Sequence, residues 1–410
     1  MAALLLGVVL AAACAGAPLA GDPDAGDKTA QCAPAWPLWD DYKAAFIEKD
    51  GRVVDHFAQH STSEGQAYAM FHALVADDAA TFARVLAWTE KYLAKGDLSK
   101  HLPAWKWALK EGAGQTKGQI EGHVIDPNAA SDADLFMAYV LVHAAVAFGH
   151  DRYAAIGGAL LARIAADEVV TLPGLGPMLL PGPTGFDTLP GFWRVNPSYQ
   201  PVPFLRWAAR VDPSGPWANV IESTVRLAEE ATPERFYPDW AAWSSVAQRF
   251  VSDAYANMPG APAGASPGVG SYDAIRAYLW PALMAPEDPL RGRLLARGSR
   301  LLEVVRTQGF VPERVDAFDA AKNVALRSGP VGFQAVGQVF ALALGDATSA
   351  EALEQRVRAE KRSNGLYGEP AFYYDHNLLL FANGWLDGRY RFRLDGSLEL
   401  KRSGAACAHR

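Results

Sequence analysis

The chain has 410 residues, of which 50% are hydrophobic and 20% charged, and its net charge is −7. This length and composition are typical of a globular protein that buries one large core or two smaller ones. The negative net charge and the lack of any long run of Lys or Arg exclude a nucleic-acid-binding protein, so no nucleic acid is expected as a partner.

The N-terminus has the pattern of a secretory signal peptide. Residues 1–19 are almost wholly apolar and rich in Ala, and the acidic residues Asp22 and Asp24 follow, although no Lys or Arg precedes the apolar stretch. We therefore expect a signal peptide over residues 1–20 and an exported mature chain over 21–410. The residues up to Cys14 match a lipoprotein cleavage box only in part, so lipidation at Cys14 is disfavoured.

The other two cysteines, Cys32 and Cys407, lie near the two ends of the mature chain. In an exported protein they can form a single disulfide that joins the ends of the domain and restricts the unfolded chain. The alternative is two free thiols at frayed ends, which an oxidising compartment disfavours. A lone pair of cysteines does not fit a zinc site, and no metal is predicted.

Between the cysteines the hydrophobic pattern is helical nearly throughout. Apolar residues recur every three or four positions, with Gly and Pro turns between the periodic segments. This pattern predicts twelve helices, near residues 40–49, 63–77, 79–94, 131–148, 153–168, 198–210, 216–231, 272–284, 289–308, 332–344, 349–360 and 374–387. Short apolar segments at 389–393 and 399–401 predict a small β-hairpin after the last helix.

The connections between these helices decide between two all-α architectures. A helical solenoid repeats its connection lengths, whereas three connections here are long and rich in Gly, Pro and aromatic residues, at 171–197, 236–271 and 310–330. We therefore expect a closed double ring of six inner and six outer helices, in which long loops form a cleft at one end. No linker divides the chain, which predicts a single domain over 21–410.

Three of the predicted helices begin with an acidic residue. Glu64 and Asp273 each lie near the start of an apolar helix, and Asp132 and Asp134 open the apolar stretch 135–148. Each acid has a structural interpretation, because acidic side chains favour helix N-termini. Ser131 is a good N-cap, and Asp273 can cap its helix or pair with Arg276 three residues later.

The segment around Glu64 has its own structural interpretation. Ser63 and Gln66 have the spacing of a capping box, in which the two side chains satisfy backbone N–H groups at the start of a helix. Taken alone, this segment indicates capping rather than catalysis. In a ring of helices, however, the same ends of the inner helices converge, so Glu64, Asp132 and Asp273 can line one cleft. Hydrolysis of a glycosidic bond needs one protonated and one ionised carboxyl group, and it needs neither metal nor cofactor.

The segment that opens at Ala130 resembles the signature of family 8 glycoside hydrolases. The matching positions are Ala130, Ser131, Asp132, Ala133, Asp134, Met137, Ala138, Leu141, Val142, Ala144 and Phe148, and Val140 stands where a small Ser or Ala is usual. The resemblance covers nearly the whole mature chain and is strongest to the endoglucanase encoded with bacterial cellulose synthase. Further matching segments lie at 51–53, 62–66, 102–105, 168–176, 196–199, 271–276 and 329–333.

This resemblance implies an (α/α)6 barrel that cleaves internal β-1,4-glucosidic bonds with inversion, in the periplasm, alongside cellulose synthesis and export. It implies that Glu64 is the general acid, that Asp273 is the general base and that Asp132 holds the reacting sugar. The expected partners are a β-1,4-glucan chain such as cellulose and the cellulose synthase complex. The resemblance implies no metal or other cofactor.

The same resemblance suggests which side chains bind the glucan. Tyr199, Arg276 and Tyr272 are expected to support the base or the reactive sugar. Trp105 and Trp107 are expected to act as stacking platforms. Asp134 is expected to be a group at the helix end or a supporting group behind the cleft, without contact with the sugar. Two alternatives stay open: another polysaccharide hydrolase of the same barrel, such as a xylanase, chitosanase or mixed-linkage glucanase, and a non-catalytic glucan-binding subunit.

Overall fold

The structure is a computed structural model that describes residues 35–110, 122–187, 189–253 and 267–401. The predicted signal peptide over 1–20, Cys14 and the Cys32–Cys407 pair all lie outside these residues. Those expectations therefore stay predictions.

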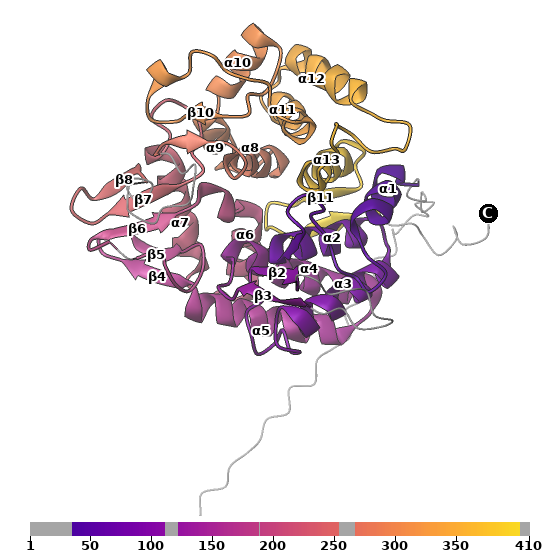
Figure 1. Ribbon diagram of the computed structural model, residues 1–410. Helices are drawn as coiled ribbons and strands as arrows, with labels where there is room; N and C mark the ends of the chain where they lie inside the picture. Colours follow the sequence, from indigo (N-terminus) through magenta and orange to yellow (C-terminus); the bar gives the residue numbers. More distant parts are fainter. Residues whose placement is uncertain (1–34, 111–121, 188, 254–266, 402–410) are drawn as a thin grey trace, which may run out of the picture.

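Within the described residues, six helices contact one another in a closed inner ring. Each inner helix touches the next, and the last touches the first. In ring order they are α2 (Ser63–Val75), α4 (Ser131–Phe148), α6 (Val202–Val211), α8 (Ala274–Leu283), α11 (Val331–Ala343) and α13 (Tyr373–Leu386). Figure 1 shows α2, α6, α8, α11 and α13 around the middle of the molecule.

A second layer of helices lies outside this ring, and each outer helix contacts the inner helix next to it in the chain. The outer helices are α3 (Ala79–Tyr92), α5 (Asp151–Asp167), α7 (Trp217–Glu230), α9 (Arg291–Arg297), α10 (Arg300–Gln308) and α12 (Ala347–Ala359), with α1 (Pro37–Phe46) packed on the last inner helix, α13. The expected (α/α)6 barrel is confirmed.

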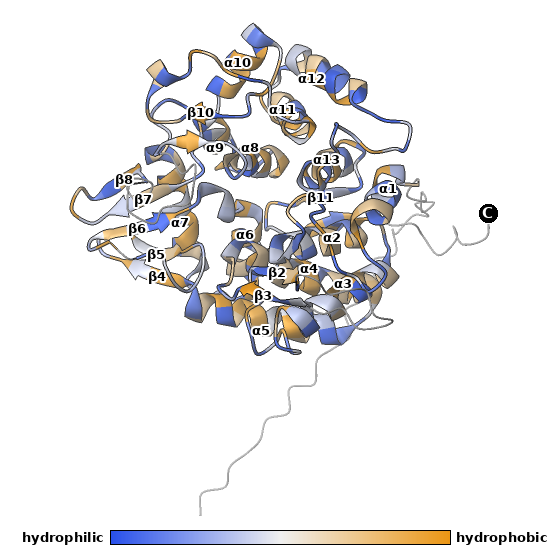
Figure 2. Ribbon diagram, viewed as in Figure 1, coloured by the Kyte–Doolittle hydropathy of each residue, from blue (hydrophilic) through white to orange (hydrophobic). Residues whose placement is uncertain are grey.

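The composition of each helix explains its layer. Every residue of α8 is buried, and so are nearly all residues of α2, because these helices have neighbours on all sides. The outer helix α12 buries only three side chains and carries charged residues on its other faces. Figure 2 shows hydrophilic residues gathered on α10 and α12 at the periphery. By length and apolarity alone α4 could cross a membrane, but 72% of it is buried inside the barrel.

An aromatic cluster fills the barrel axis at Phe136. Its ring contacts aromatic rings from four other inner helices, with centroid separations between 4.6 and 6.0 Å; the partners are Tyr68, Phe71, Phe204, Trp280 and Phe381. Three of these residues follow a polar residue by one helical turn on the same face: Tyr68 follows Glu64, Phe136 follows Asp132, and Trp280 follows Arg276. The cluster therefore forms an apolar layer directly below the polar side chains at the helix ends.

The structure corrects one predicted helix. The expected helix over 289–308 is broken into α9 and α10 at Gly298 and Ser299. Gly298 lies against the ring of Tyr278, where a Cβ atom would come within 2.6 Å of the ring. The other eleven predicted helices are present, with ends shifted by a few residues. A short 3₁₀ turn, η1 (Pro197–Tyr199), precedes α6, and another, η3 (Ala320–Lys322), precedes α11.

The long connections contain short antiparallel strands that the sequence did not predict. One three-stranded sheet contains β1 (His60–Thr62), β2 (Lys106–Leu109) and β3 (Gly122–Asp126), and another contains β6 (Phe192–Val195), β7 (Ala241–Ser244) and β8 (Arg249–Ser252). Two further sheets have two strands each: β4 (Val169–Leu172) pairs with β5 (Gly176–Leu179), and β9 (Val269–Gly270) pairs with β10 (Val315–Asp316). These strands hold the connections in place, and several of the connections surround the acidic helix ends.

The predicted terminal hairpin is confirmed as β11 (Tyr390–Phe392) and β12 (Leu398–Leu400). Its turn packs between α4 and α6: the Tyr139 hydroxyl donates to the Gly396 carbonyl at 2.8 Å, and a Cβ atom on Gly396 would lie 2.1 Å from the Pro203 carbonyl oxygen. The Leu398 amide donates to the His143 ring at 3.1 Å. The hairpin therefore fastens two neighbouring inner helices together.

Candidate active site

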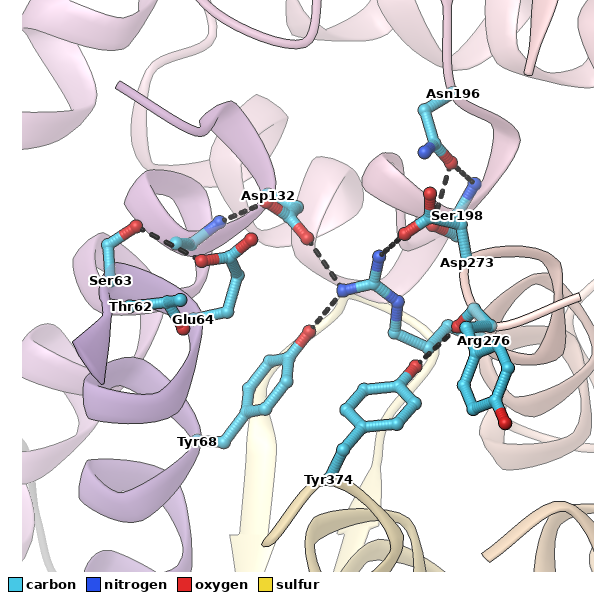
Figure 3. A network of polar contacts seen from close by, with 12 residues as sticks. Thr62, Ser63, Glu64, Tyr68, Asp132, Asn196, Ser198, Asp273, Arg276 and Tyr374 are labelled. Carbon is cyan, nitrogen blue, oxygen red and sulfur yellow. Dashed lines mark hydrogen bonds and ion pairs between the residues drawn. The ribbon is translucent and has the colours of Figure 1, made fainter. Parts of the chain in front are cut away.

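Three carboxyl groups meet at one end of the inner ring. Glu64 lies in the first turn of α2, Asp132 lies in the first turn of α4, and Asp273 is the N-cap residue of α8. Figure 3 shows their side chains around a common space, with Glu64 and Asp273 on opposite sides of Asp132 and Arg276. The convergence expected for a ring of helices is confirmed.

Arg276 organises this group of acids. Its Nη1 donates to Asp132 Oδ2 at 2.8 Å and its Nη2 donates to Asp273 Oδ1 at 2.8 Å, while the Tyr68 hydroxyl lies 2.6 Å from Nη1. The Arg276 side chain is 5% exposed and the Asp132 side chain 6%, whereas the Asp273 side chain is 32% exposed. An arginine stays charged at every accessible pH. It therefore fixes the orientation of both carboxylates and leaves part of Asp273 open to the cleft.

The Glu64 carboxyl group occupies a different environment from Asp273. Trp105 Nε1 donates to Glu64 Oε1 at 2.9 Å, and the Ser63 hydroxyl lies 3.4 Å from Oε2. Burial raises the pKa of Glu64 to about 8, and the negative charge of Asp132 adds to this effect, while Arg276 and Trp105 act in the opposite direction. Glu64 therefore holds a proton at neutral pH, as a general acid must.

Asp132 is the most enclosed of the three acids. Burial raises the pKa of Asp132 to about 6, although Arg276 favours its charged form. Its Oδ1 accepts a hydrogen bond from the Ala133 amide at 2.9 Å, so one oxygen is held by its own helix and the other by Arg276. The side chain is thus fixed on two sides.

The caps of α2 and α4 differ from those expected. The N-cap of α2 is Thr62, whose hydroxyl accepts from the Gly65 amide at 3.2 Å. Gln66 does not complete a capping box, because its Oε1 accepts from the Val53 amide at 2.7 Å instead. The N-cap of α4 is Ala130, and the hydroxyl of Ser131 makes no hydrogen bond within the described residues. Neither Glu64 nor Asp132 is therefore the N-cap residue of its helix, although Asp132 accepts from the Ala133 amide.

A cavity of about 460 Å³ opens over Glu64 and Asp273. Aromatic and polar side chains line it from three inner helices and their loops: Asp55, His60, Thr62, Tyr68, Trp105, Tyr272, Arg276, Phe372, Tyr373, Tyr374 and Asp375. Apolar rings with a few convergent polar groups are typical of a site that binds a carbohydrate-sized ligand. The predicted cleft is present at the end of the barrel where the acids lie.

Four of the predicted binding residues lie at this site. The Arg276 guanidinium lies over the Tyr199 ring at 5.4 Å, so Tyr199 is buried beside the acids. Trp105 is half-buried beside Glu64, and Tyr272 is 46% exposed at the rim, where its hydroxyl donates to Glu313 Oε1 at 3.0 Å. These four side chains lie around the three acids, and their contact with a sugar stays a prediction.

The prediction for Trp107 is wrong. Trp107 is 1% exposed and packs edge-to-face on Trp88 at 5.3 Å, under the guanidinium of Arg52. Trp105 and Trp107 are two positions apart, which places both on one face of a regular strand. Trp105, however, lies in a bend just before β2 and outside the strand, so strand alternation does not relate its side chain to that of Trp107. Trp107 therefore stabilises the core and offers no stacking surface.

The sequence also missed several tyrosines. Tyr68 contacts Arg276, and the Tyr374 hydroxyl donates to the Tyr272 carbonyl at 2.7 Å, so α13 contributes to the site. Tyr68 follows Glu64 by four residues, and this helical spacing could have identified it. Tyr374 had no such signal, because its neighbour in space lies 102 residues away in the chain.

Asp134 forms a buried acidic pair with Glu168 behind Asp132. Both side chains are fully buried, they bond to each other, and no other donor within the described residues reaches their oxygens. Burial raises the pKa of both well above their usual values; the charge of Glu168 adds to this effect on Asp134, whereas the hydrogen bond with Asp134 acts in the opposite direction on Glu168. At least one of the two therefore carries a proton, and the pair does not face the cleft.

The arrangement offers two carboxyl groups with opposite character and a third that lies between them. Glu64 is protonated and held by an indole N–H, and Asp273 is paired with a cation and partly open to solvent. No cluster of three metal-ligating side chains occurs within the described part of the chain. Acid and base catalysis by carboxyl groups is the chemistry that this geometry supports.

Comparisons with known proteins agree with this chemistry. The family model for glycosyl hydrolases family 8 matches residues 28–388. The chain is 40% identical over 384 residues to an endoglucanase of Xanthomonas axonopodis pv. citri (strain 306), with 92% of each chain covered. It is 38% identical over 387 residues to an endoglucanase of Escherichia coli (strain K12), covering 92% of this chain and 94% of the relative.

A solved structure shows the same fold. The crystal structure of an endo-1,4-D-glucanase from Vibrio fischeri ES114 aligns with a TM-score of 0.78 and 34% sequence identity. The alignment covers 90% of this chain and 99% of that one.

Proposed function

Because the chain belongs to glycoside hydrolase family 8, we propose that it is an endo-β-1,4-glucanase that hydrolyses internal glucosidic bonds of cellulose with inversion at the anomeric carbon. The observation that carries the proposal is the contrast between Glu64 and Asp273. The Glu64 carboxyl group keeps a proton and the Asp273 carboxyl group forms an ion pair with Arg276, on two sides of a cavity that is large enough for sugar rings. The names of the similar proteins support a β-1,4-glucan as the substrate.

The proposed mechanism assigns one step to each acid. Glu64 donates its proton to the glycosidic oxygen as the bond breaks. Asp273 accepts a proton from a water molecule, which attacks the anomeric carbon from the opposite face. Asp132, which is held by Arg276 and the Ala133 amide, accepts a hydrogen bond from a hydroxyl of the reacting ring. Inversion needs room for that water, so the two catalytic carboxyl groups of a bound complex should lie roughly 6.5–9.5 Å apart.

The assignment is tested by hydrolysis of carboxymethyl-cellulose with the wild type, Glu64→Gln and Asp273→Asn. Each variant should lose about 10²- to 10⁴-fold in kcat, because each removes one proton-transfer group. Nuclear magnetic resonance of the first products should show the α-anomer. Retained activity in either variant, or a β-anomeric first product, contradicts the mechanism. Release of reducing ends from xylan or chitosan in preference to cellulose would replace the substrate.

We also propose that the chain acts outside the cytoplasm, in the periplasm, during cellulose synthesis and export. The apolar segment 1–19 supports export. The resemblance to the endoglucanase encoded with cellulose synthase supports the cellular task and the synthase complex as a partner. Cell fractionation and pull-down with the synthase test these two points separately.

A further inference from the structure

Asp273 occupies the N-cap position of α8 but does not cap the helix with its own side chain. An N-cap aspartate ordinarily accepts hydrogen bonds from the backbone amides of the first turn. Here the Asp273 side chain makes no such bond, and its Oδ1 is paired with Arg276 instead. The Ile275 and Arg276 amides donate instead to the Ser271 and Asp273 carbonyls, each at 3.1 Å, and the Ala274 amide at the start of α8 needs a further acceptor.

Asp239 supplies that acceptor from a distant part of the chain. Its Oδ1 accepts from three backbone amides, those of Ser271 at 2.8 Å, Asp273 at 3.1 Å and Ala274 at 2.7 Å. One carboxylate oxygen thus holds the whole turn that carries Asp273. The Asp239 amide in addition donates to the Val269 carbonyl at 2.7 Å, so its backbone and its side chain both fasten the same segment.

The segment that carries Asp239 is itself fixed to α8. The Tyr237 amide donates to the Tyr278 hydroxyl at 2.9 Å, and Tyr278 lies on α8. The Tyr237 carbonyl packs so closely on Gly270 that a Cβ atom there would lie 2.0 Å from its oxygen. Five hydrogen bonds and one close backbone contact therefore hold residues 237–239 against α8 and the segment that precedes it.

From this geometry we propose that Asp239 is a positioning residue for Asp273: by accepting from the Ser271, Asp273 and Ala274 amides it fixes the turn that leads into α8, so that the Asp273 carboxylate faces the cleft as general base. This inference rests on the proposed function, because it needs Asp273 to be that base. Asp239 itself touches no reacting atom. Its contribution is the placement of the Asp273 backbone, and a misplacement near 1 Å can cost about 10²-fold in rate.

Asp239 can hold the three amides in either protonation state. Burial and the charge of Asp273 raise the pKa of Asp239 to about 7, while the three amides favour its charged form. A proton on Oδ2 leaves Oδ1 free to accept all three bonds. Asparagine also keeps an oxygen acceptor on a side chain of the same length, whereas alanine keeps none.

The test compares Asp239→Ala with Asp239→Asn by steady-state kinetics on carboxymethyl-cellulose. Asp239→Ala should lower kcat by about 10- to 100-fold with KM within about twofold of the wild type. Asp239→Asn should restore kcat to within about threefold of the wild type. If Asp239→Ala does not fold, Asp239→Glu replaces it, because the longer side chain displaces the acceptor and should lower kcat in the same way.

Asp346→Ala is the matched control for loss of a helix cap. Asp346 caps the outer helix α12 through the Ser349 amide at 3.0 Å, and it is not among the residues that line the cavity. Its loss should lower the melting temperature without changing kcat. The proposal is overturned if kcat of Asp239→Ala matches that of Asp346→Ala, if KM rises while kcat is unchanged, or if Asp239→Asn is as impaired as Asp239→Ala. An active Asp273→Asn variant would instead contradict the proposed function.

Discussion

The hydrogen bond from Trp105 to Glu64 lowers the pKa of the proposed general acid, and this effect can be measured. The indole N–H stabilises the charged form of Glu64, so it holds the pKa below the value that burial alone would set. Trp105→Phe keeps an aromatic ring and removes the donor. The alkaline limb of kcat/KM, which the wild type should show near pH 8, is expected to move to higher pH by about one unit.

Trp107→Phe is the control for this measurement. Trp107 lies two residues further along but is packed on Trp88, away from the acids. Its replacement should leave the alkaline limb in place. A limb that stays fixed in Trp105→Phe, or moves to lower pH, would show that Glu64 is not the group whose ionisation ends activity.

At the scale of residues, the sequence predicted the acids and missed what holds them. Glu64, Asp132 and Asp273 could be found because each begins an apolar helix. Asp239 could not be found, since it lies in a loop and meets Asp273 across 34 residues of chain. Trp107 could not be separated from Trp105 by spacing, because the sequence does not show that the strand begins only at Lys106 and leaves Trp105 in the bend before it.

At the scale of elements, the turn of the β11–β12 hairpin should be unusually sensitive to substitution. Gly396 has a φ of 79°, and a Cβ atom added to it would lie 2.1 Å from the Pro203 carbonyl oxygen. Gly149, at the end of α4, has a φ of 71° and open space around it. Gly149→Ala should lower the free energy of unfolding by about 1–2 kcal/mol, the cost of the left-handed conformation alone. Gly396→Ala should lower it by about 3 kcal/mol or more, because the hairpin must also move.

Urea unfolding of both variants checks this prediction. Equal losses would show that the hairpin turn moves away from α6 without cost. Hydrolysis of carboxymethyl-cellulose below the unfolding transition should be little changed in either variant, since neither glycine lines the cavity.

The helices could be predicted from hydrophobic spacing, because inner and outer helices bury faces of regular period. The short strands could not. Strands such as β9, which has two residues, are too short for alternation to be recognised and depend on partners far away in the chain. The break at Gly298 was missed for a related reason: the apolar period continues across it, and the contact that requires a glycine comes from α8.

At the scale of the whole molecule, buried acids and buried histidines give stability opposite dependences on pH. The pKa values of Glu64 (about 8), Asp239 and Asp375 (about 7) are raised by burial, so the folded state keeps protons that the unfolded chain has lost. Stability should therefore fall as pH rises toward 8. Burial lowers the pKa of His72 to about 3 and of His143 to about 4, so stability is also lost as pH falls below about 6.5.

Above about pH 6.5 the histidines no longer titrate in either state, so the melting temperature should decline between about pH 6.5 and 8. Differential scanning calorimetry at constant ionic strength measures this directly. Glu64→Gln should show a shallower decline, because its side chain does not titrate. A melting temperature that rises across this interval would contradict the assignment of raised pKa values to the buried acids.

The contact between α1 and α13 joins the two ends of the described chain, so the barrel can close only after α13 has been synthesised. The Trp36 indole donates to Asn383 at 2.6 Å, across 347 residues, and the Arg389 guanidinium donates to the Ala35 carbonyl at 2.8 Å. The first outer helix thus packs on the last inner one. A growing chain can pair α2 with α3 and α4 with α5 as they emerge, but the circle stays open until α13 is made. Contacts of such long range form late, and the final closing step is therefore the one that commits the whole barrel.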